Sequence, residues 1–327
     1  MAVIDKFFSK GRILFYLLAI FIFFLIGISF SIFRWNILNP LKEHKLNINN
    51  LDRKFYFHVP KHLKHNSKLI FVLHGSTMTA TQMQLVTGHQ FDKIADEKED
   101  SIIVYPQGYK KYWNDCRKSA LTESKKANLD EVLFFQEMIS FFENNYQIDS
   151  SKVFITGFSN GGHMTFKLAM EHPSLFKGYA VISANLPVSI NNDCSESKKP
   201  VSILVVNGTS DPVNPYSGGK VVVGDGIDRG EVLSTEETMK YWLHLTKCKL
   251  DGEDELPDIE ESDHSQAKLI RYNCPSSKVQ LKQIKILNGG HNIPNPTFFL
   301  WPTKLLGNVN EDLNVPEIIM NFFYELN

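Results

Sequence analysis

One serine of this chain lies in a sequence pattern that suits a nucleophile. Ser159 is the central residue of Gly-Phe-Ser-Asn-Gly at positions 157–161, a Gly-x-Ser-x-Gly pattern. Residues 153–156 are rich in β-branched side chains and predict a short buried strand, whereas residues 162–172 predict a helix. A serine at such a tight turn projects its hydroxyl out of the sheet, and flanking glycines avoid collisions there. The pattern therefore predicts a nucleophilic Ser159; the alternative is a glycine-rich turn that contains a serine by chance.

A serine hydroxyl becomes a good nucleophile when a base removes its proton and a carboxylate orients that base. Two later residues suit these roles: Asp211 follows the apolar strand expected at 201–206, and His291 follows the strand expected at 279–287. Each would be an ordinary turn residue if seen alone. In a parallel sheet, residues just past the carboxyl ends of strands can converge at one edge. We therefore expect Ser159, Asp211 and His291 to meet there.

Attack by a serine on a carbonyl creates an oxyanion, which needs hydrogen-bond donors already in place. One expected donor is the backbone N–H of Asn160, directly after the nucleophile. The other is expected from the turn His-Gly-Ser-Thr at 74–77, which follows an apolar strand at 69–73. Ser76 is the first choice in that turn and Thr77 the second.

Strands that alternate with helices must position these residues. The pattern predicts one α/β domain from 53 to 327, with a mostly parallel central sheet and helices on both faces. Strands are expected at 53–59, 69–73, 101–105, 153–156, 178–184, 201–206, 268–272 and 279–287, and helices at 129–145, 162–172, 234–245 and 314–324.

Composition narrows the classes of function. The chain has 327 residues and a net charge of −1, which argues against nucleic-acid binding through bulk electrostatics. The eight carboxylates of 251–263 do not have EF-hand spacing and are interpreted as a solvated loop. We expect no metal ion and no other cofactor.

The N-terminal region has the features of a membrane segment. Residues 13–33 carry no charge and are dominated by Ile, Leu and Phe, and 21 residues at 1.5 Å rise span a ~30 Å bilayer core. A short cytoplasmic N-terminus (1–12) with three basic residues precedes them. This pattern predicts a transmembrane signal anchor followed by a tether at 34–52; a cleaved signal peptide is the alternative. Either way the main domain is expected in the periplasm or outside the cell, anchored or secreted.

The four cysteines agree with that compartment. They lack Cys-x-x-Cys spacing and form no Cys/His cluster of the kind that binds zinc. In an oxidising compartment they can form two disulfides with three connectivities. Cys248 and Cys274 bracket the acidic loop, so this pair is the first choice and leaves Cys116 with Cys194. Free buried thiols are the alternative.

From about residue 54 to 323 the chain resembles the poly(3-hydroxybutyrate) depolymerase and feruloyl/acetylxylan esterase (carbohydrate esterase family 1-like) group of α/β-hydrolases. The shared motifs are Leu-His-Gly (73–75), Tyr-Pro-Gln-Gly (105–108), Trp-Asn-Asp (113–115), Ile-Asp (148–149), the serine turn (156–162), Gly-Thr-Ser-Asp-Pro-Val (208–213), Pro-Tyr (215–216) and Gly-Gly-His (289–291). The resemblance implies an α/β-hydrolase fold, a triad of Ser159, His291 and Asp211, and ester hydrolysis through an acyl-enzyme without a metal.

The chain departs from this group after the histidine. Members often have Trp-Pro directly after it, whereas here Asn-Ile-Pro (292–294) follows and a tryptophan comes only at Trp301. Trp113 and Trp301 are candidate substrate contacts, and a core position is the alternative for both.

The leading hypothesis is a serine esterase that acts on a polyhydroxybutyrate-type polyester or its oligomers. The apolar stretch 298–301 favours such a substrate. A feruloyl/acetylxylan-type esterase is the first alternative. A peptidase of the same fold and a non-catalytic extracellular binding module are the others.

Overall fold

The computed structural model describes residues 41–225, 227–275, 278–298 and 301–326. The chain divides into a short unit, Met1–Lys42, and a large unit, Glu43–Asn327. The expected cytoplasmic segment 1–12 and membrane segment 13–33 lie outside the described residues, as do residues 34–40 of the expected tether. Among the residues that are described, no helix has the length and apolar character needed to cross a membrane.

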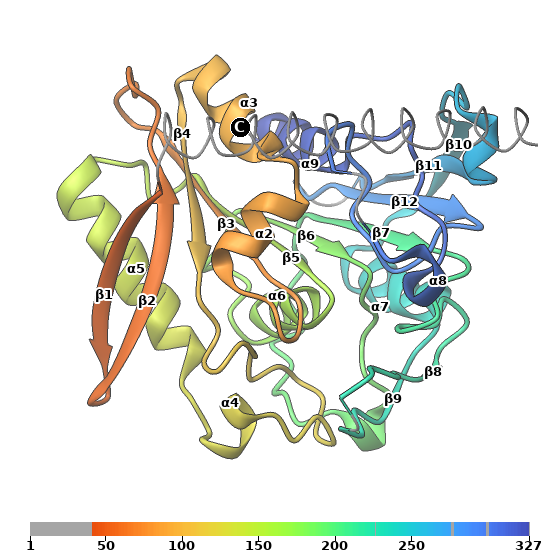
Figure 1. Cartoon of the computed structure of the whole chain (residues 1–327), viewed down its shortest axis with the longest axis horizontal. Coiled ribbons are helices and arrows are strands. Elements are labelled where there is room, and N and C mark those ends of the chain that lie inside the picture. The colour runs from red at the N-terminus through yellow and green to blue at the C-terminus, as the bar shows by residue number, and fades with distance from the viewer. Residues whose placement is uncertain (1–40, 226, 276–277, 299–300, 327) are drawn as a thin grey trace, which may run out of the picture. The chain divides into compact units, whose positions relative to one another are not determined.

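Ten strands of the described region form one sheet in the order β1-β2-β4-β3-β5-β6-β7-β12-β11-β10 (Figure 1). The six strands from β4 to β12 in this order run parallel to one another, while β2 pairs antiparallel with β4, β11 with β12, and β10 with β11. The strands are β1 (Lys42–Ile48), β2 (Leu51–His58), β3 (Lys68–Leu73), β4 (Ser101–Pro106), β5 (Val153–Phe158), β6 (Gly178–Ile182), β7 (Ile203–Gly208), β10 (Lys249–Glu255), β11 (Gln266–Asn273) and β12 (Leu281–Leu287), and a separate hairpin contains β8 (Gly219–Lys220) and β9 (Glu231–Val232).

The helices lie on both sides of this sheet. They are α2 (Ala80–Val86), α3 (Gln90–Lys98), α4 (Glu123–Lys126), α5 (Glu131–Tyr146), α6 (Asn160–Glu171), α7 (Thr235–Thr246), α8 (Thr303–Leu306) and α9 (Val315–Glu325). Successive strand residues point to opposite faces, and the aromatic contacts follow this rule. Phe71 of β3 packs on Phe135 of α5, with ring centroids 5.5 Å apart, while Phe154 of β5 packs on Phe323 of α9 at 4.9 Å. The mostly parallel sheet with two helical layers is the architecture that the sequence predicts.

The central strands are buried along their whole length. Every residue of β3, β4, β5, β6 and β7 is buried, which explains why their sequences are mostly apolar. Two helix starts also follow the sequence: Ser234 and Glu237 form the expected capping box of α7, and the side chain of Asn314 caps α9.

The structure differs from the sequence-based expectation at two edge strands. Residues 42–48, expected within a tether, form β1 at one edge of the sheet. Part of the acidic segment, expected as a loop, forms β10 at the other edge. An edge strand bonds to one neighbour and needs no apolar run, so charged sequences can form it.

Candidate active site

Ser159 lies in the turn between β5 and α6. Its φ and ψ are 55° and −118°, and its backbone N–H donates to the Ile182 carbonyl at 2.9 Å. A positive φ is uncommon for a residue with a side chain. The conformation places Ser159 at the carboxyl end of β5, half-buried and directly before the first turn of α6.

Two glycines make this turn possible. A Cβ at position 161 would lie 2.6 Å from the Leu73 carbonyl oxygen, and a Cβ at position 157 would lie 2.2 Å from the carbonyl oxygen of residue 161. Both distances are too short for a carbon and an oxygen in contact. The Gly-x-Ser-x-Gly pattern is therefore required by the close approach of β5, α6 and the end of β3.

The structure brings together the three residues that the sequence singles out. His291 Nε2 lies 3.0 Å from Ser159 Oγ, and His291 Nδ1 lies 2.7 Å from Asp211 Oδ2. The other carboxylate oxygen of Asp211 accepts from the backbone N–H groups of Val213 and Asn214, each at 2.8 Å. These bonds fix the carboxylate, which in turn favours the imidazole tautomer that carries its proton on Nδ1.

The loops that carry Asp211 and His291 follow neighbouring parallel strands, β7 and β12. Thr209 N–H donates to the Ile286 carbonyl at 2.8 Å, and Ser210 N–H donates to the Gly289 carbonyl at 2.9 Å. His291 N–H donates to the Leu306 carbonyl at 2.6 Å. The two loops are thus bonded to each other and to the α8 region, and only 7% of Asp211 and 5% of His291 is exposed.

Backbone donors lie where the sequence predicts an oxyanion site. Ser76 and Ser159 line the same pocket, and Asn160 is the first residue of α6. Within the described parts of the chain, no acceptor is found for the N–H of Ser76 or Asn160, whereas Thr77 N–H donates to the Lys111 carbonyl at 3.1 Å. The start of α6 favours negative charge near the N–H of Asn160. Ser76 and Asn160 therefore stay the predicted donors, whereas Thr77, whose N–H is already bonded, does not suit this role.

The pocket in front of Ser159 has a volume of about 440 Å³ and a largely apolar wall. Trp301, a candidate substrate contact, lies in this wall, with its ring 5.7 Å from Phe158 and 5.6 Å from Phe298 between centroids. Leu85, Val86, Val213, Val223 and Leu306 complete the apolar part. Leu85 and Val86 belong to α2 and Leu306 to α8, while the two valines lie in loops, and the sequence offered no signal for their convergence.

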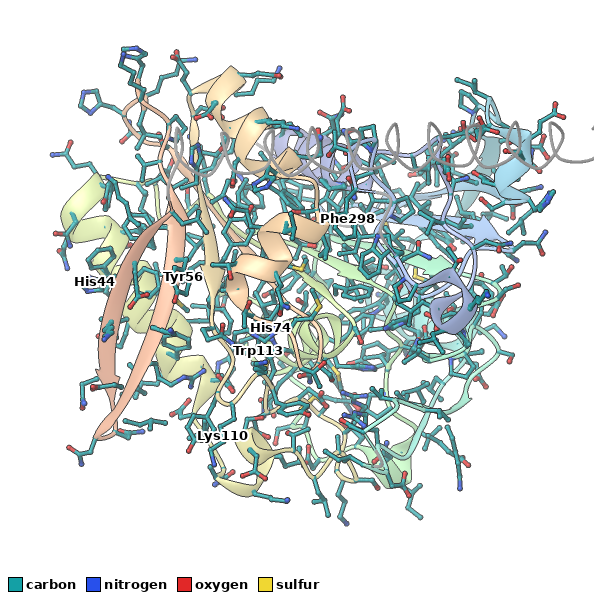
Figure 2. All side chains as sticks on the ribbon, viewed as in Figure 1. His44, Tyr56, His74, Lys110, Trp113 and Phe298 are labelled. Atoms are coloured by element: carbon teal, nitrogen blue, oxygen red, sulfur yellow. A yellow bond between two sulfur atoms is a disulfide. The ribbon has the colours of Figure 1, made fainter. Side chains whose placement is uncertain are left out.

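The prediction that Trp113 contacts substrate is wrong. Trp113 is 1% exposed and does not line the pocket. Its indole N–H donates to the His74 carbonyl at 2.9 Å, and its ring stacks on Phe135 with centroids 6.1 Å apart. Figure 2 labels Trp113 and His74 next to each other. Trp113 therefore occupies a core position, which was the alternative, because its indole packs between the turn at residues 74–77 and Phe135.

Both expected disulfides are present. Cys116 pairs with Cys194, and Cys248 pairs with Cys274. The first joins the segment after β4 to the segment after β6, and the second joins the start of β10 to the end of β11. Both pairings confirm the first-choice connectivity.

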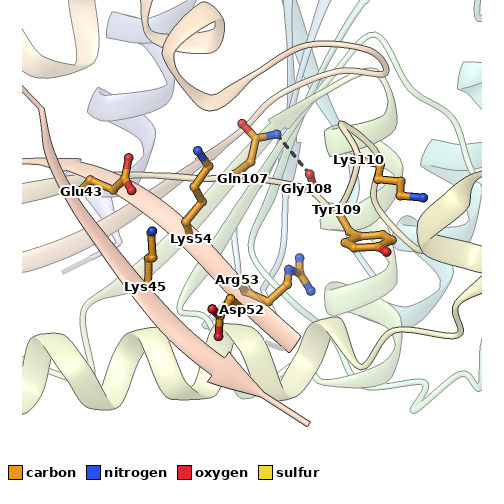
Figure 3. A pocket seen from close by; sticks show the side chains of 9 residues that line it. All are labelled: Glu43, Lys45, Asp52, Arg53, Lys54, Gln107, Gly108, Tyr109 and Lys110. Atoms are coloured by element: carbon orange, nitrogen blue, oxygen red, sulfur yellow. Dashed lines mark hydrogen bonds between the residues drawn. The ribbon is translucent and has the colours of Figure 1, made fainter. Parts of the chain in front are cut away.

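A second pocket, of about 330 Å³, lies beside β1, β2 and the turn after β4 (Figure 3). Its wall carries both signs of charge and contains Glu43, Lys45, Asp52, Arg53, Lys54, Gln107, Gly108, Tyr109 and Lys110. None of the three converging residues lines it. Across the described residues, no three His, Cys, Asp or Glu side chains gather in a way that could hold a metal ion.

The family described as "Putative esterase" matches residues 47–233. Acetylxylan esterase A of Aspergillus oryzae is 27% identical over 259 residues, which cover 73% of this chain and 80% of that protein. "Probable feruloyl esterase C" of the same species is 28% identical over 180 residues, covering 54% of this chain and 60% of that protein.

A solved structure has the same fold. The acetyl xylan esterase from Aspergillus awamori superposes with a TM-score of 0.53 and 17% identity, covering 77% of this chain and 95% of that one. At this identity the similarity shows the fold, an α/β-hydrolase type with a mostly parallel central sheet.

Proposed function

The chain belongs to the esterase family whose profile it matches over residues 47–233, and from this premise we propose that Ser159, His291 and Asp211 are the catalytic triad of a carboxylic ester hydrolase. The single observation that carries the proposal is the pair of contacts at His291, 3.0 Å to Ser159 Oγ and 2.7 Å to Asp211 Oδ2. A base within hydrogen-bond reach of the nucleophile and of an orienting carboxylate is the arrangement that serine hydrolysis needs.

The proposed reaction has two halves. Ser159 Oγ attacks the ester carbonyl carbon while His291 Nε2 takes the hydroxyl proton, and the N–H groups of Ser76 and Asn160 stabilise the oxyanion. His291 then gives its proton to the leaving oxygen, so the alcohol departs and the acyl group stays on Ser159. Water attacks this acyl-enzyme, His291 takes the water proton, and the acid leaves as Ser159 recovers its hydrogen. Asp211 stabilises the imidazolium in both halves.

For the substrate we put acetyl and feruloyl esters of plant-type polysaccharides first. Two similar Aspergillus proteins are named as an acetylxylan esterase and a probable feruloyl esterase, which supports this choice. The aromatic wall formed by Phe158, Phe298 and Trp301 also suits a planar aromatic acyl group.

Polyhydroxybutyrate-type polyester or its oligomers are the second candidate. The same apolar wall supports them, because no Asp, Glu, Lys or Arg lines this pocket. A branched aliphatic acyl chain would bury its methyl group there.

A substrate panel separates these readings. The full chain, purified in detergent, is assayed with p-nitrophenyl acetate, methyl ferulate, acetylated xylan, hydroxybutyrate oligomers and a peptide library, beside Ser159→Ala. Loss of ester hydrolysis in the variant is expected. Equal inactivity of both proteins would support a binding module instead, and peptide cleavage without ester cleavage would support a peptidase.

We also propose that the catalytic domain works outside the cytoplasm. The disulfides Cys116–Cys194 and Cys248–Cys274 support this, since such bonds persist in oxidising compartments. Residues 13–33 would serve as the anchor, or as a signal that is removed. Fractionation of expressing cells distinguishes an anchor from a cleaved signal. An intact chain in the membrane fraction means an anchor, and a soluble product shortened by ~30 residues means cleavage.

A further inference from the structure

The two proposed oxyanion donors come from different elements. Ser76 lies in the turn after β3, and Asn160 is the first residue of α6. An oxyanion site works only if its donors are held in place before the reaction, to within about 0.5 Å. The segment 107–117, which follows β4, makes hydrogen bonds to both sides of this site.

On the Ser76 side the contacts go through His74. Gly108 N–H and the Gln107 side-chain amide lie 2.9 and 3.1 Å from His74 Nε2, so this nitrogen is the acceptor. His74 Nδ1–H therefore donates to the Gly75 carbonyl at 2.8 Å. Figure 3 shows Gln107 at the start of the segment, with its amide on the Gly108 carbonyl. Burial lowers the pKa of His74 to about 4, so the ring stays neutral and keeps both bonds at neutral pH.

On the Asn160 side the contacts go through its side chain. Asn160 Oδ1 accepts from Trp113 N–H at 2.8 Å, and Nδ2 donates to Asp115 Oδ2 at 2.6 Å. Arg117 holds that carboxylate through Nη2 at 2.6 Å and Nε at 3.1 Å. Burial alone would raise the pKa of Asp115, but the guanidinium of Arg117 lowers it well below its ordinary value. Asn160 is thus fixed by a buried ion pair.

One residue touches both sides. Trp113 bonds to Asn160 through its backbone N–H, and its indole Nε1–H donates to the His74 carbonyl at 2.9 Å. The Trp113 and His74 rings also lie against each other, with centroids 5.1 Å apart (Figure 2). Trp113 is 1% exposed and does not line the substrate pocket.

We propose that Trp113 is a positioning residue that sets the separation of the two oxyanion donors, together with the side chain of Asn160 held by Asp115. The inference rests on the proposed esterase function. Trp113 acts through His74 and Asn160, without contact to substrate. Loss of its indole N–H leaves the His74 carbonyl without this bond and frees the turn that carries Ser76.

The test compares Trp113→Phe and Asn160→Ala with a matched control, Trp242→Phe. Trp242 is 0% exposed and lies in α7, and its indole N–H has no hydrogen-bond partner among the described residues. Both tryptophan changes remove a similar buried volume, but only the first removes a hydrogen bond to the oxyanion turn. Asn160→Ala removes the side chain and leaves the backbone donor. The measurements, on the full chain, are kcat and KM for p-nitrophenyl acetate, Ki for a trifluoromethyl ketone, and the melting temperature.

A trifluoromethyl ketone adds to the serine and forms a tetrahedral oxyanion, so its affinity reports on the donors. Trp113→Phe and Asn160→Ala are expected to lower kcat by roughly 10-fold or more, to raise Ki by the same factor and to leave KM unchanged. Trp242→Phe is expected to have the kcat, KM and Ki of the wild type.

Several results would overturn the inference. One is a folded Trp113→Phe with wild-type kcat and Ki; another is a fall in kcat without a change in Ki; a third is the same loss in Trp242→Phe. If Trp113→Phe does not fold, Asn160→Ala decides by the same criteria. A wild-type chain that hydrolyses no ester would instead refute the proposed function, and the two failures are therefore distinguishable.

Discussion

Ser159 has a backbone conformation that is costly for any residue with a side chain. Its φ of 55° and ψ of −118° lie in a region where glycine is favoured, and such outliers cost of order 1–3 kcal/mol. The hydrogen bond from its N–H to Ile182 at 2.9 Å and the first turn of α6 hold it there. This conformation places the Ser159 hydroxyl 3.0 Å from His291 Nε2.

This strain predicts that the serine lowers stability. Ser159→Gly relieves the conformation and is expected to raise the free energy of unfolding by about 1 kcal/mol while abolishing ester hydrolysis. Ser159→Ala, which keeps the Cβ, is expected to be equally inactive without that gain. Urea unfolding of both variants measures the difference; a glycine variant no more stable than the alanine variant would count against the strain.

His74 gives the fold a dependence on pH. Burial lowers the pKa of His74 to about 4, below the ordinary 6.5, so the unfolded chain binds its proton more readily than the folded chain. Stability from the neutral ring is present above pH 6.5 and is lost as the pH falls toward 4. Burial also lowers the pKa of His89 to about 4, so neutral His89 contributes stability that is lost over the same pH range.

We therefore expect the free energy of unfolding to fall between pH 6.5 and 4, by up to about 3 kcal/mol from His74. Urea unfolding at several pH values measures this slope. In His74→Asn, which cannot titrate, the slope should be smaller. An unchanged slope in that variant would show that His74 does not contribute.

At the scale of elements, the approach of α6 to the end of β3 is close enough to exclude a methyl group. A Cβ at position 161 would lie 2.6 and 2.7 Å from the carbonyl oxygens of Leu73 and His74. Gly161→Ala is expected to cost about 2 kcal/mol of stability and to lower kcat, because overpacking moves both Ser159, the proposed nucleophile, and the turn that carries Ser76.

Gly224→Ala is the control for this change. A Cβ there meets nothing within 4 Å, so stability should change by less than about 0.5 kcal/mol. Urea midpoints of the two variants are compared. Similar midpoints would mean that the contact between α6 and β3 is looser than the geometry indicates.

The elements differ in how well the sequence predicts them. The runs at 69–73 and 102–105 are apolar because β3 and β4 are buried on both faces. In β1 and β10 most residues are exposed, so their sequences resemble linker and loop. These two segments form strands because their backbones pair with one neighbouring strand, and such pairing leaves no signature in side-chain hydrophobicity.

The same contrast holds for the site. The convergence of Ser159, Asp211 and His291 was predictable because each lies in the segment just after a strand of the parallel sheet, and these strand ends meet at one edge. Trp113 was not, because its position depends on His74 and Phe135, which other elements supply. The pocket wall likewise combines residues from α2, α8 and several loops.

At the scale of the molecule, the disulfides close loops of different length. The sequence separation is 78 residues for Cys116–Cys194 and 26 for Cys248–Cys274. Loop-closure entropy makes the longer bridge more stabilising by about 1 kcal/mol, from (3/2)RT ln 3. Cys116 also lies between Asp115 and Arg117, which hold the Asn160 side chain.

Replacing each pair by alanines tests this difference. The Cys116/Cys194 variant is expected to lose about 1 kcal/mol more free energy of unfolding than the Cys248/Cys274 variant. It is also expected to have the lower kcat of the two. Denaturant unfolding and p-nitrophenyl acetate hydrolysis provide both values. Equal losses, or an unchanged kcat in the Cys116/Cys194 variant, would contradict the prediction.

The most direct test of the catalytic assignment is to identify the residue that becomes acylated. The full chain is mixed with p-nitrophenyl acetate, quenched in acid within milliseconds and digested for mass spectrometry. We predict an added acetyl group on Ser159, with none in Ser159→Ala. Ester hydrolysis by the wild type with the acyl group on another residue, or hydrolysis retained by Ser159→Ala, would contradict the assignment.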